Sequence, residues 1–115
     1  MTGPSDDCRA MVLGRAGFGC EYCGGPLNPC SIHHRRPRQM GSTKADWINR
    51  PENLLALCGS GTTGCHGYFE SHRTEGYSIG VLLRQGLWPW ETPYRDRLGR
   101  WWLLSGETRI PITLP

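Results

Sequence analysis

Two pairs of cysteines constrain the fold of this chain more than any other feature. Cys20 and Cys23 are separated by two residues in the segment CEYC, and two glycines follow them. Cys58 and Cys65 enclose the glycine-rich segment GSGTTG. Structural zinc takes four thiolate or imidazole ligands in a tetrahedron, and a two-residue gap in a turn lets both sulfurs reach one ion. The pattern predicts a structural Zn²⁺ held by all four thiolates, which would tie these segments together.

The size and composition of the chain fit a small stapled domain. Its 115 residues allow one domain with one modest core. No basic start with an apolar run resembles a signal peptide, and no stretch reaches the roughly 18 apolar residues of a membrane span. We therefore expect a cytoplasmic protein without membrane contact, in which reduced cysteines bind metal. Three disulfides in an exported domain are the alternative.

The apolar and turn patterns predict an α+β fold in a single domain over residues 1–115. Ser5 suits the cap of an N-terminal helix that ends within 14–19. Cys8 on this helix is expected to be a small core residue, and Cys30 a structural or spare thiol. Strands are expected at 27–34, 52–58 and 81–83, a helix at 66–78, and a β-hairpin from 100–104 and 108–112 with Pro111 in an edge strand.

Three histidines and one amide lie inside or directly beside the cysteine frame. His33 and His34 are adjacent, Asn53 precedes the apolar segment LLALC, and His66 follows the last cysteine of the frame. Neutral imidazole binds divalent metals and can accept a proton near neutral pH. One such histidine alone would more often be a packed core residue. Their coincidence indicates a second metal site, one that performs chemistry.

The order and spacing of these motifs resemble the HNH endonuclease family. The segments CEYC, IHHRRPR, NRPENLLALC, GTTGCHG and ESHR are most similar to small phage-type members in which two cysteine pairs bind zinc. The resemblance covers roughly residues 15–75, in a motif core placed at about 15–78, followed by a variable aromatic tail over 79–115. It implies a zinc-stapled ββα-metal domain, with the predicted N-terminal helix and C-terminal hairpin attached to it.

The family resemblance also implies a function and roles for single residues. It implies a metal-dependent endonuclease that hydrolyses DNA, encoded by a bacteriophage, acting in the host cytoplasm and working with a phage terminase. His33 and His66 would bind a divalent cation, and His34 would be the general base that activates water. Asn53 would orient the loop that carries the base. Because imidazole and carboxylate ligands suit different metals, the catalytic cation stays open among Mg²⁺, Mn²⁺, Ni²⁺, Co²⁺ and Zn²⁺.

A third ligand for the catalytic cation could be Glu70 or His72. On a helix, position i+4 lies over position i, so Glu70 shares the face of His66. His72, at i+6, points away from that face in a regular helix. Many family members carry histidine at the i+4 place, where this chain has glutamate. Glu70 is therefore the first choice and His72 the alternative.

A basic segment follows the paired histidines. The side chains expected to contact nucleic-acid phosphates are Arg35, Arg36, Arg38 and Lys44. A solvated basic loop is the simpler interpretation of these charges. A zinc-stabilised nucleic-acid-binding module without catalysis is the alternative function, and an RNA nuclease is a third.

The tail is rich in tryptophan. Trp88 and Trp90 lie in an irregular segment, and Trp101 and Trp102 lie in the predicted hairpin. In a small domain such side chains commonly fill a thin core. Stacking on nucleic-acid bases and a partner surface are the alternatives.

Overall fold

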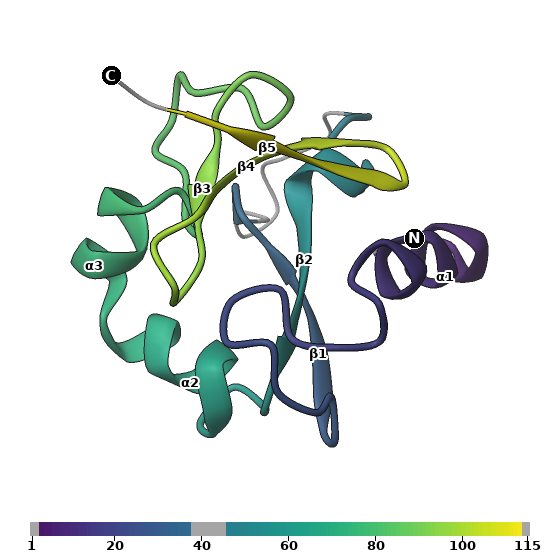
Figure 1. Cartoon of the computed structure of the whole chain (residues 1–115), viewed down its shortest axis with the longest axis vertical. Helices are drawn as coiled ribbons and strands as arrows, with labels where there is room; N and C mark the ends of the chain where they lie inside the picture. The colour runs from purple at the N-terminus through teal and green to yellow at the C-terminus, as the bar shows by residue number, and fades with distance from the viewer. Residues whose placement is uncertain (1–2, 38–45, 114–115) are drawn as a thin grey trace.

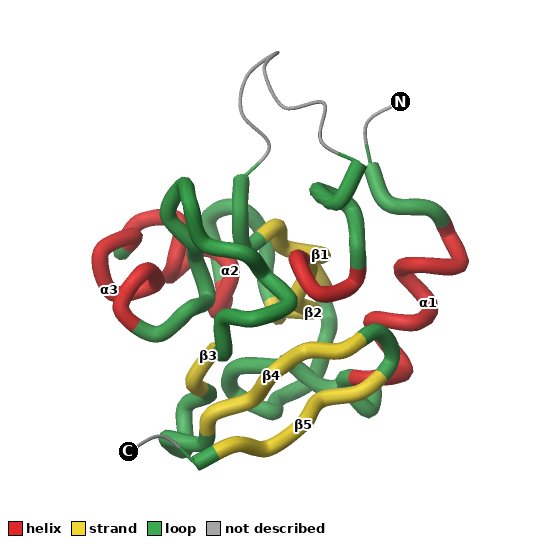
Figure 2. Tube along the Cα trace, turned by 90° about the horizontal axis from the view of Figure 1, so that it is seen from above, coloured by secondary structure: helices red, strands yellow, loops and turns green. Residues whose placement is uncertain are grey.

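The computed structural model describes residues 3–37 and 46–113 as an α+β fold with two small antiparallel sheets (Figures 1 and 2). The predicted α+β class is confirmed. None of the helices within these ranges is long and apolar enough to cross a membrane. The elements are α1 (Asp6–Arg15), β1 (Cys30–His34), the 3₁₀ helix η1 (Pro51–Asn53), β2 (Leu54–Cys58), α2 (Gly64–Ser71), α3 (Arg73–Ser78), β3 (Tyr94–Arg95), β4 (Trp101–Ser105) and β5 (Thr108–Ile112).

The antiparallel pair β1–β2 lies at the centre of the fold, and its register sets His34 opposite Leu54. Both faces of β2 are buried. Leu54 and Ala56 pack toward α1, whereas Leu55 and Leu57 pack toward α2. Figure 1 shows the two helices on opposite sides of the pair. Burial on both faces explains why β2 is a continuous apolar run without alternation.

Both of these predicted strands are confirmed, but each begins later than the sequence pattern indicates. β1 begins at Cys30 and β2 at Leu54, instead of at residues 27 and 52. Pro29 precedes β1, and Pro51 opens the 3₁₀ helix before β2. Proline has no backbone N–H to donate to a strand ladder. β1 therefore starts only after Pro29, and β2 only after the 3₁₀ helix that Pro51 opens.

α1 is the predicted N-terminal helix, and a buried ion pair anchors it to β2. The Oγ atom of Ser5 accepts the backbone N–H of Cys8 at 3.1 Å, which confirms the predicted cap. Nη2 of Arg15, in the last turn, lies 2.8 Å from Oε1 of Glu21, and both side chains are fully buried. Glu21 also accepts the backbone N–H of Ala56 at 2.9 Å. The CEYC turn, in which Glu21 lies, is thereby held against β2.

The single helix predicted over 66–78 is wrong, because the chain forms two helices with a break at His72. His72 has φ −126° and ψ 60°, outside the helical range. Just before the break, Oγ of Ser71 donates to two backbone carbonyls of α2 and competes with the helical pattern. After the break, Gly76 of α3 packs on Leu82, whose Cδ1 would lie 2.9 Å from an added Cβ.

The strand predicted at 81–83 is also wrong. Val81, Leu82 and Leu83 form an irregular segment and are at most 2% exposed. The backbone N–H of Leu83 donates to the carbonyl of Arg35 at 2.8 Å, and that of Leu82 to the carbonyl of Gly76 at 3.1 Å. The apolar residues are therefore buried between the end of β1 and α3 instead of being paired in a strand ladder.

The predicted C-terminal hairpin is confirmed as β4 and β5, with Gly106 in its turn. Pro111 lies in β5, which is an edge strand of the order β3-β4-β5, as predicted. The short strand β3 was not anticipated. Asp96 joins β3 to β4, because its carboxylate accepts the backbone N–H of Arg100 and Nε1–H of Trp102, each at 3.0 Å.

Candidate metal centres

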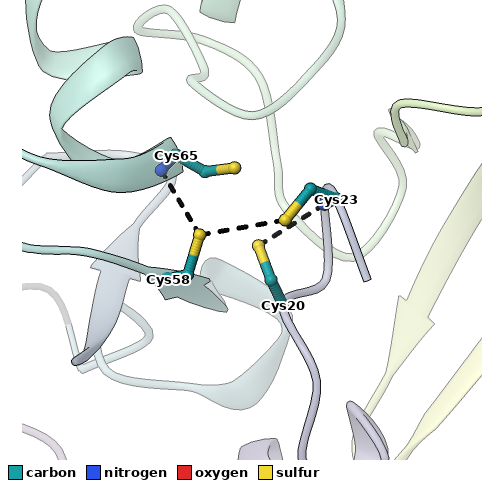
Figure 3. Close-up of side chains that lie close together, drawn as sticks. All are labelled: Cys20, Cys23, Cys58 and Cys65. Carbon is teal, nitrogen blue, oxygen red and sulfur yellow. Dashed lines mark hydrogen bonds between the residues drawn. The ribbon is translucent and has the colours of Figure 1, made fainter. Parts of the chain in front are cut away.

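The four cysteines predicted to bind zinc lie together, with all four Sγ atoms within 4.8 Å of one another (Figure 3). Cys20 and Cys23 come from the turn after α1, Cys58 ends β2, and Cys65 lies in the first turn of α2. The Sγ atoms of Cys23 and Cys58 are 3.8 Å apart. Four thiolates about 2.3 Å from one zinc ion lie about 3.8 Å from each other. The cluster could therefore hold a structural metal such as zinc.

Glycines allow the second cysteine pair to converge. Gly59 has φ 98°, and an added Cβ would lie 1.9 Å from the carbonyl oxygen of Thr63. Gly64 has φ 65°, and its added Cβ would lie 2.6 Å from the carbonyl oxygen of Cys58. The loop between these cysteines is therefore folded too tightly for a side chain at either position. This explains how a six-residue gap can still deliver Cys58 and Cys65 to one point.

Hydrogen bonds to sulfur favour the thiolate form of Cys20 in this cluster. The backbone N–H groups of Cys23 and Cys65 donate to the sulfurs of Cys20 and Cys58, at 3.4 and 3.5 Å. The thiol of Cys65, followed by backbone N–H groups, lowers the pKa of Cys20 to about 4 despite its burial. The same interaction raises the pKa of Cys65, which keeps its proton. A bound cation would replace such shared protons, because metal-bound cysteines are deprotonated.

The other two cysteines lie outside the cluster, as expected. Cys30 is exposed at the start of β1. Cys8 is half-buried, and its thiol donates to the backbone carbonyl of Asn49 at 3.3 Å.

A second group of metal-binding side chains is formed by His33, His66 and Glu70, whose nearest ligand atoms lie within 4.8 Å of one another. His33 comes from β1, and the other two come from one face of α2. Nε2 of His66 is 3.5 Å from Oε2 of Glu70, and the rings of His33 and His66 are 5.3 Å apart between centroids. The first choice for the third ligand thus lies with both histidines.

The backbone fixes which nitrogen each histidine offers in this group. Nε2 of His33 lies 2.8 Å from the carbonyl oxygen of Val81, so it carries the proton and donates. Nδ1 of His66 likewise donates to the carbonyl oxygen of Ser60 at 3.1 Å. The lone pairs are therefore on Nδ1 of His33 and Nε2 of His66. A metal-binding histidine almost always donates its other ring N–H in this way.

His33 is 2% exposed, and its burial keeps it neutral. Loss of solvation on burial lowers its pKa to about 3, although the Val81 carbonyl opposes the shift. Neutral imidazole is the form that binds a cation. His33 is thus kept in the neutral form that can bind a metal over the pH range in which proteins normally work.

His34, the predicted general base, lines a cleft together with these metal-binding side chains. This cleft has a volume of about 280 Å³, and its lining includes His33, His34, His66, Glu70 and Arg73. Nε2 of His34 lies 2.8 Å from Oδ1 of Asn49. Because an amide oxygen only accepts, Nε2 carries the proton and the lone pair is on Nδ1.

Sequence analysis did not single out Asn49 or Arg73. Nη1 of Arg73 lies 3.3 Å from Oε1 of Glu70. Asn49 belongs to the segment NRPEN and Arg73 to the segment ESHR. A single amide or guanidinium in such a segment does not by itself indicate a role in a metal or catalytic site.

Asn53 is fully buried, and its side chain joins both ends of the segment between β1 and η1. Oδ1 accepts the backbone N–H of Arg36 at 2.8 Å, and Nδ2 donates to the carbonyls of Arg36 and Ile48 at 3.2 and 2.8 Å. The side chain thus fixes the backbone next to His34, and this contact pattern is the one expected of a residue that orients a loop.

His72, the alternative third ligand, points to another partner. Its ring stacks on Tyr68, with centroids 4.1 Å apart and planes 10° from parallel. Its Nδ1 lies 2.9 Å from the carbonyl oxygen of Tyr68. The break between α2 and α3 gives His72 this direction, and the structure brings only Glu70 of the two to the histidines.

The expectation that Arg35 contacts phosphate is wrong. Its side chain is fully buried, and its guanidinium donates to four backbone carbonyl oxygens at 2.6 to 3.1 Å. Arg36, in contrast, is only half-buried, with its guanidinium 5.2 Å from the ring centroid of Trp47. Arg38 and Lys44 lie outside the described residues. The acceptors around Arg35 are the carbonyls of Glu52, Gly80, Pro89 and Thr92.

The chain was compared with models of protein families, with curated proteins and with solved structures, and none of them matches it. The function is therefore inferred from the sequence pattern and from the geometry of the two clusters.

Proposed function

We propose that this chain is a metal-dependent endonuclease of the HNH type that hydrolyses phosphodiester bonds of DNA. The observation that carries the proposal is the meeting of His33, His66 and Glu70 beside His34 in one cleft. A zinc-binding module without catalysis needs only the four cysteines. It gives no reason for ring nitrogens of His33 and His66 to lie beside one carboxylate.

The order of the elements also supports this proposal. The cleft is built from an antiparallel strand pair and the helix that follows it, which is the arrangement that a ββα-metal fold requires. Cys65 and His66 are adjacent in α2, one in each candidate centre. A metal held by the cysteines would fix the start of α2, and with it the position of His66 relative to β1.

Each of these side chains in the cleft can perform a different part of the hydrolysis. Nδ1 of His34 accepts a proton from the attacking water, and Asn49 holds the ring in that orientation. Arg73 adds positive charge beside Glu70, suited to a phosphate oxygen. A divalent cation held by His33, His66 and Glu70 would offset the charge that develops on the phosphate and the leaving oxygen.

Cleavage of supercoiled plasmid by the pure protein, in a panel of divalent cations, tests the proposal. We expect relaxed or linear product only with an added cation, and a rate about 10²- to 10⁴-fold lower for His34→Ala. Zinc content and the unfolding transition of the variant should match those of the wild type. Cleavage by His34→Ala at the wild-type rate would rule out the assigned base. A plasmid and a single-stranded DNA that both stay uncut in every cation would contradict the DNA endonuclease and favour the binding module.

A further inference from the structure

Three tryptophans from two distant segments meet at the surface. Trp88 and Trp90 stack on each other, with centroids 5.3 Å apart and planes 20° from parallel. Trp47 meets both of them edge-on, at 5.6 and 6.0 Å between centroids. Trp88 is 42% exposed and Trp90 37%. Neither ring belongs to the buried core clusters, so the simpler interpretation of the tail does not account for this pair.

Two arginines complete this group. The guanidinium of Arg36 lies 5.2 Å from the ring centroid of Trp47, and that of Arg50 lies 5.6 Å from the centroid of Trp90. Within residues 3–37 and 46–113, no guanidinium is placed over Trp88 in this way. We call Trp47, Trp88, Trp90, Arg36 and Arg50 the tryptophan–arginine patch. It combines positive charge with the exposed ring of Trp88, over which the described part of the chain places no guanidinium.

The patch is connected through the backbone to residues of the cleft of the proposed nuclease. Arg36 is two residues from His34, and its backbone N–H and carbonyl are both bound by the buried amide of Asn53. Arg50 directly follows Asn49, whose amide holds the ring of His34. The backbone that positions the proposed base therefore also positions both arginines of the patch. We therefore expect a strand that has its phosphate in the cleft to lie close to both arginines.

The chemistry of the patch selects an unpaired base over a duplex. Bases stacked inside a duplex expose only their edges and the backbone, whereas an unpaired base exposes its π-face to an aromatic ring. Arginine and aromatic residues together bind the backbone and the base faces of single strands. We infer that the tryptophan–arginine patch binds an unpaired nucleotide of single-stranded DNA beside the cleft. The inference rests on the proposed function, since it assigns the proposed nuclease to DNA with single-stranded segments, such as flaps and gaps.

Binding of a short oligo-thymidine strand and of a duplex of equal length tests this inference, without added divalent cation so that no strand is cut. Binding is followed by the tryptophan fluorescence of the protein. A separate single strand that contains 2-aminopurine reports stacking, because the emission of this base is quenched when it stacks. We expect the wild type to bind the single strand more tightly than the duplex. Trp88→Leu should weaken single-strand binding by about 10- to 100-fold. Trp88→Phe, which keeps an aromatic face, should retain most of it.

Leu87→Ala is the matched control, because Leu87 is an exposed apolar neighbour in the same segment, 44% exposed. It should bind like the wild type, and all variants should keep their zinc and their unfolding transition. Equal binding of duplex and single strand, or equal affinity of Trp88→Leu and wild type, would overturn the inference. So would equal losses in Trp88→Leu and Leu87→Ala, which would indicate an apolar contact without stacking.

The two proposals can fail separately. If plasmid is cut but Trp88→Leu binds single strands as the wild type does, the nuclease stands and the patch does not select unpaired bases. If Trp88→Leu loses single-strand binding but no cation supports cleavage, the patch stands and the protein binds DNA without cutting it.

Discussion

The side chains of His34 and Asn49 are joined by a hydrogen bond of 2.8 Å between Nε2 and Oδ1. The backbone carbonyl of Asn49 in turn accepts the thiol of Cys8, on α1, at 3.3 Å. The orientation of the proposed base is thus linked to the N-terminal helix, which supplies no side chain to the cleft lining. Asn49 is therefore a positioning residue.

Asn49→Ala should reduce the rate of plasmid cleavage with little effect on substrate binding. The imidazole of His34 remains, but its ring and its tautomer are no longer fixed. We expect kcat to fall by about 10- to 100-fold, less than for removal of the base, and KM to change little. Steady-state kinetics on a labelled oligonucleotide measure both. A rise in KM at unchanged kcat would show that Asn49 binds substrate instead.

Cys58→Ser should unfold the protein, whereas Cys30→Ser should not. Structural zinc contributes about 10–16 kcal/mol of apparent binding free energy in zinc-finger peptides, more than the whole stability of most small domains. Cys30 is exposed and lies outside the cluster, so it controls for the loss of a thiol. Zinc content and circular-dichroism melting measure the effect. A zinc-free Cys58→Ser variant that still unfolds cooperatively would contradict the four-thiolate site.

Features encoded over short distances were predictable from the sequence. The CEYC turn, the buried run of β2 and the C-terminal hairpin each depend on residues within one segment, where periodicity and glycine or proline placement are informative. The meeting of the four cysteines was predicted from their spacing, and the grouping of His33 with His66 from a resemblance that stays a prediction. The structure brings each of these sets together.

Features decided by tertiary contacts were not predictable from the sequence. After the break at His72, α3 packs on Leu82, a contact between separate segments, and the apolar segment 81–83 looks like a strand until its burial is known. Arg35 shows the same limit. Arginine beside two histidines suggests phosphate binding, but the carbonyls that enclose it come from segments 17 to 57 residues away.

Arg35→Met and Arg36→Met form a matched pair that separates folding from binding. Removal of the Arg35 guanidinium leaves four buried carbonyls without a donor, so we expect a loss of more than about 3 kcal/mol in the free energy of unfolding. Arg36→Met should change stability by less than about 0.5 kcal/mol but weaken DNA binding. Urea unfolding and oligonucleotide binding measure the two effects. A stable Arg35→Met variant with weaker DNA binding would restore the phosphate-binding role of Arg35.

Asp96→Asn should destabilise the protein by about 1.5–3 kcal/mol at pH 7, because its carboxylate accepts charge-assisted hydrogen bonds. Burial opposes the charge on Asp96, but hydrogen bonds from Trp102 and Arg100 outweigh it and hold the pKa below its usual range. Stability from a lowered carboxyl pKa is complete above the unfolded pKa of about 4 and is lost below it. In urea unfolding, the difference between wild type and variant should stay constant from pH 7 to about pH 5. A difference that already shrinks over this range would show that the pKa of Asp96 is not lowered, and a difference that persists unchanged well below the unfolded pKa would show that the charge does not contribute.

Glu70→Gln and His72→Ala should affect the catalytic cation differently. Oε2 of Glu70 lies 3.5 Å from Nε2 of His66, whereas the ring of His72 stacks on Tyr68. Loss of the carboxylate removes both a ligand and a negative charge, so we expect Mn²⁺ affinity to fall by about 10- to 100-fold. His72→Ala should bind Mn²⁺ like the wild type. Calorimetric titration of the zinc-loaded protein measures both, and Ni²⁺ should be affected less by Glu70→Gln than Mn²⁺, because imidazole contributes more of its binding. Weaker Mn²⁺ binding by His72→Ala, with Glu70→Gln unchanged, would reverse the assignment of the third ligand.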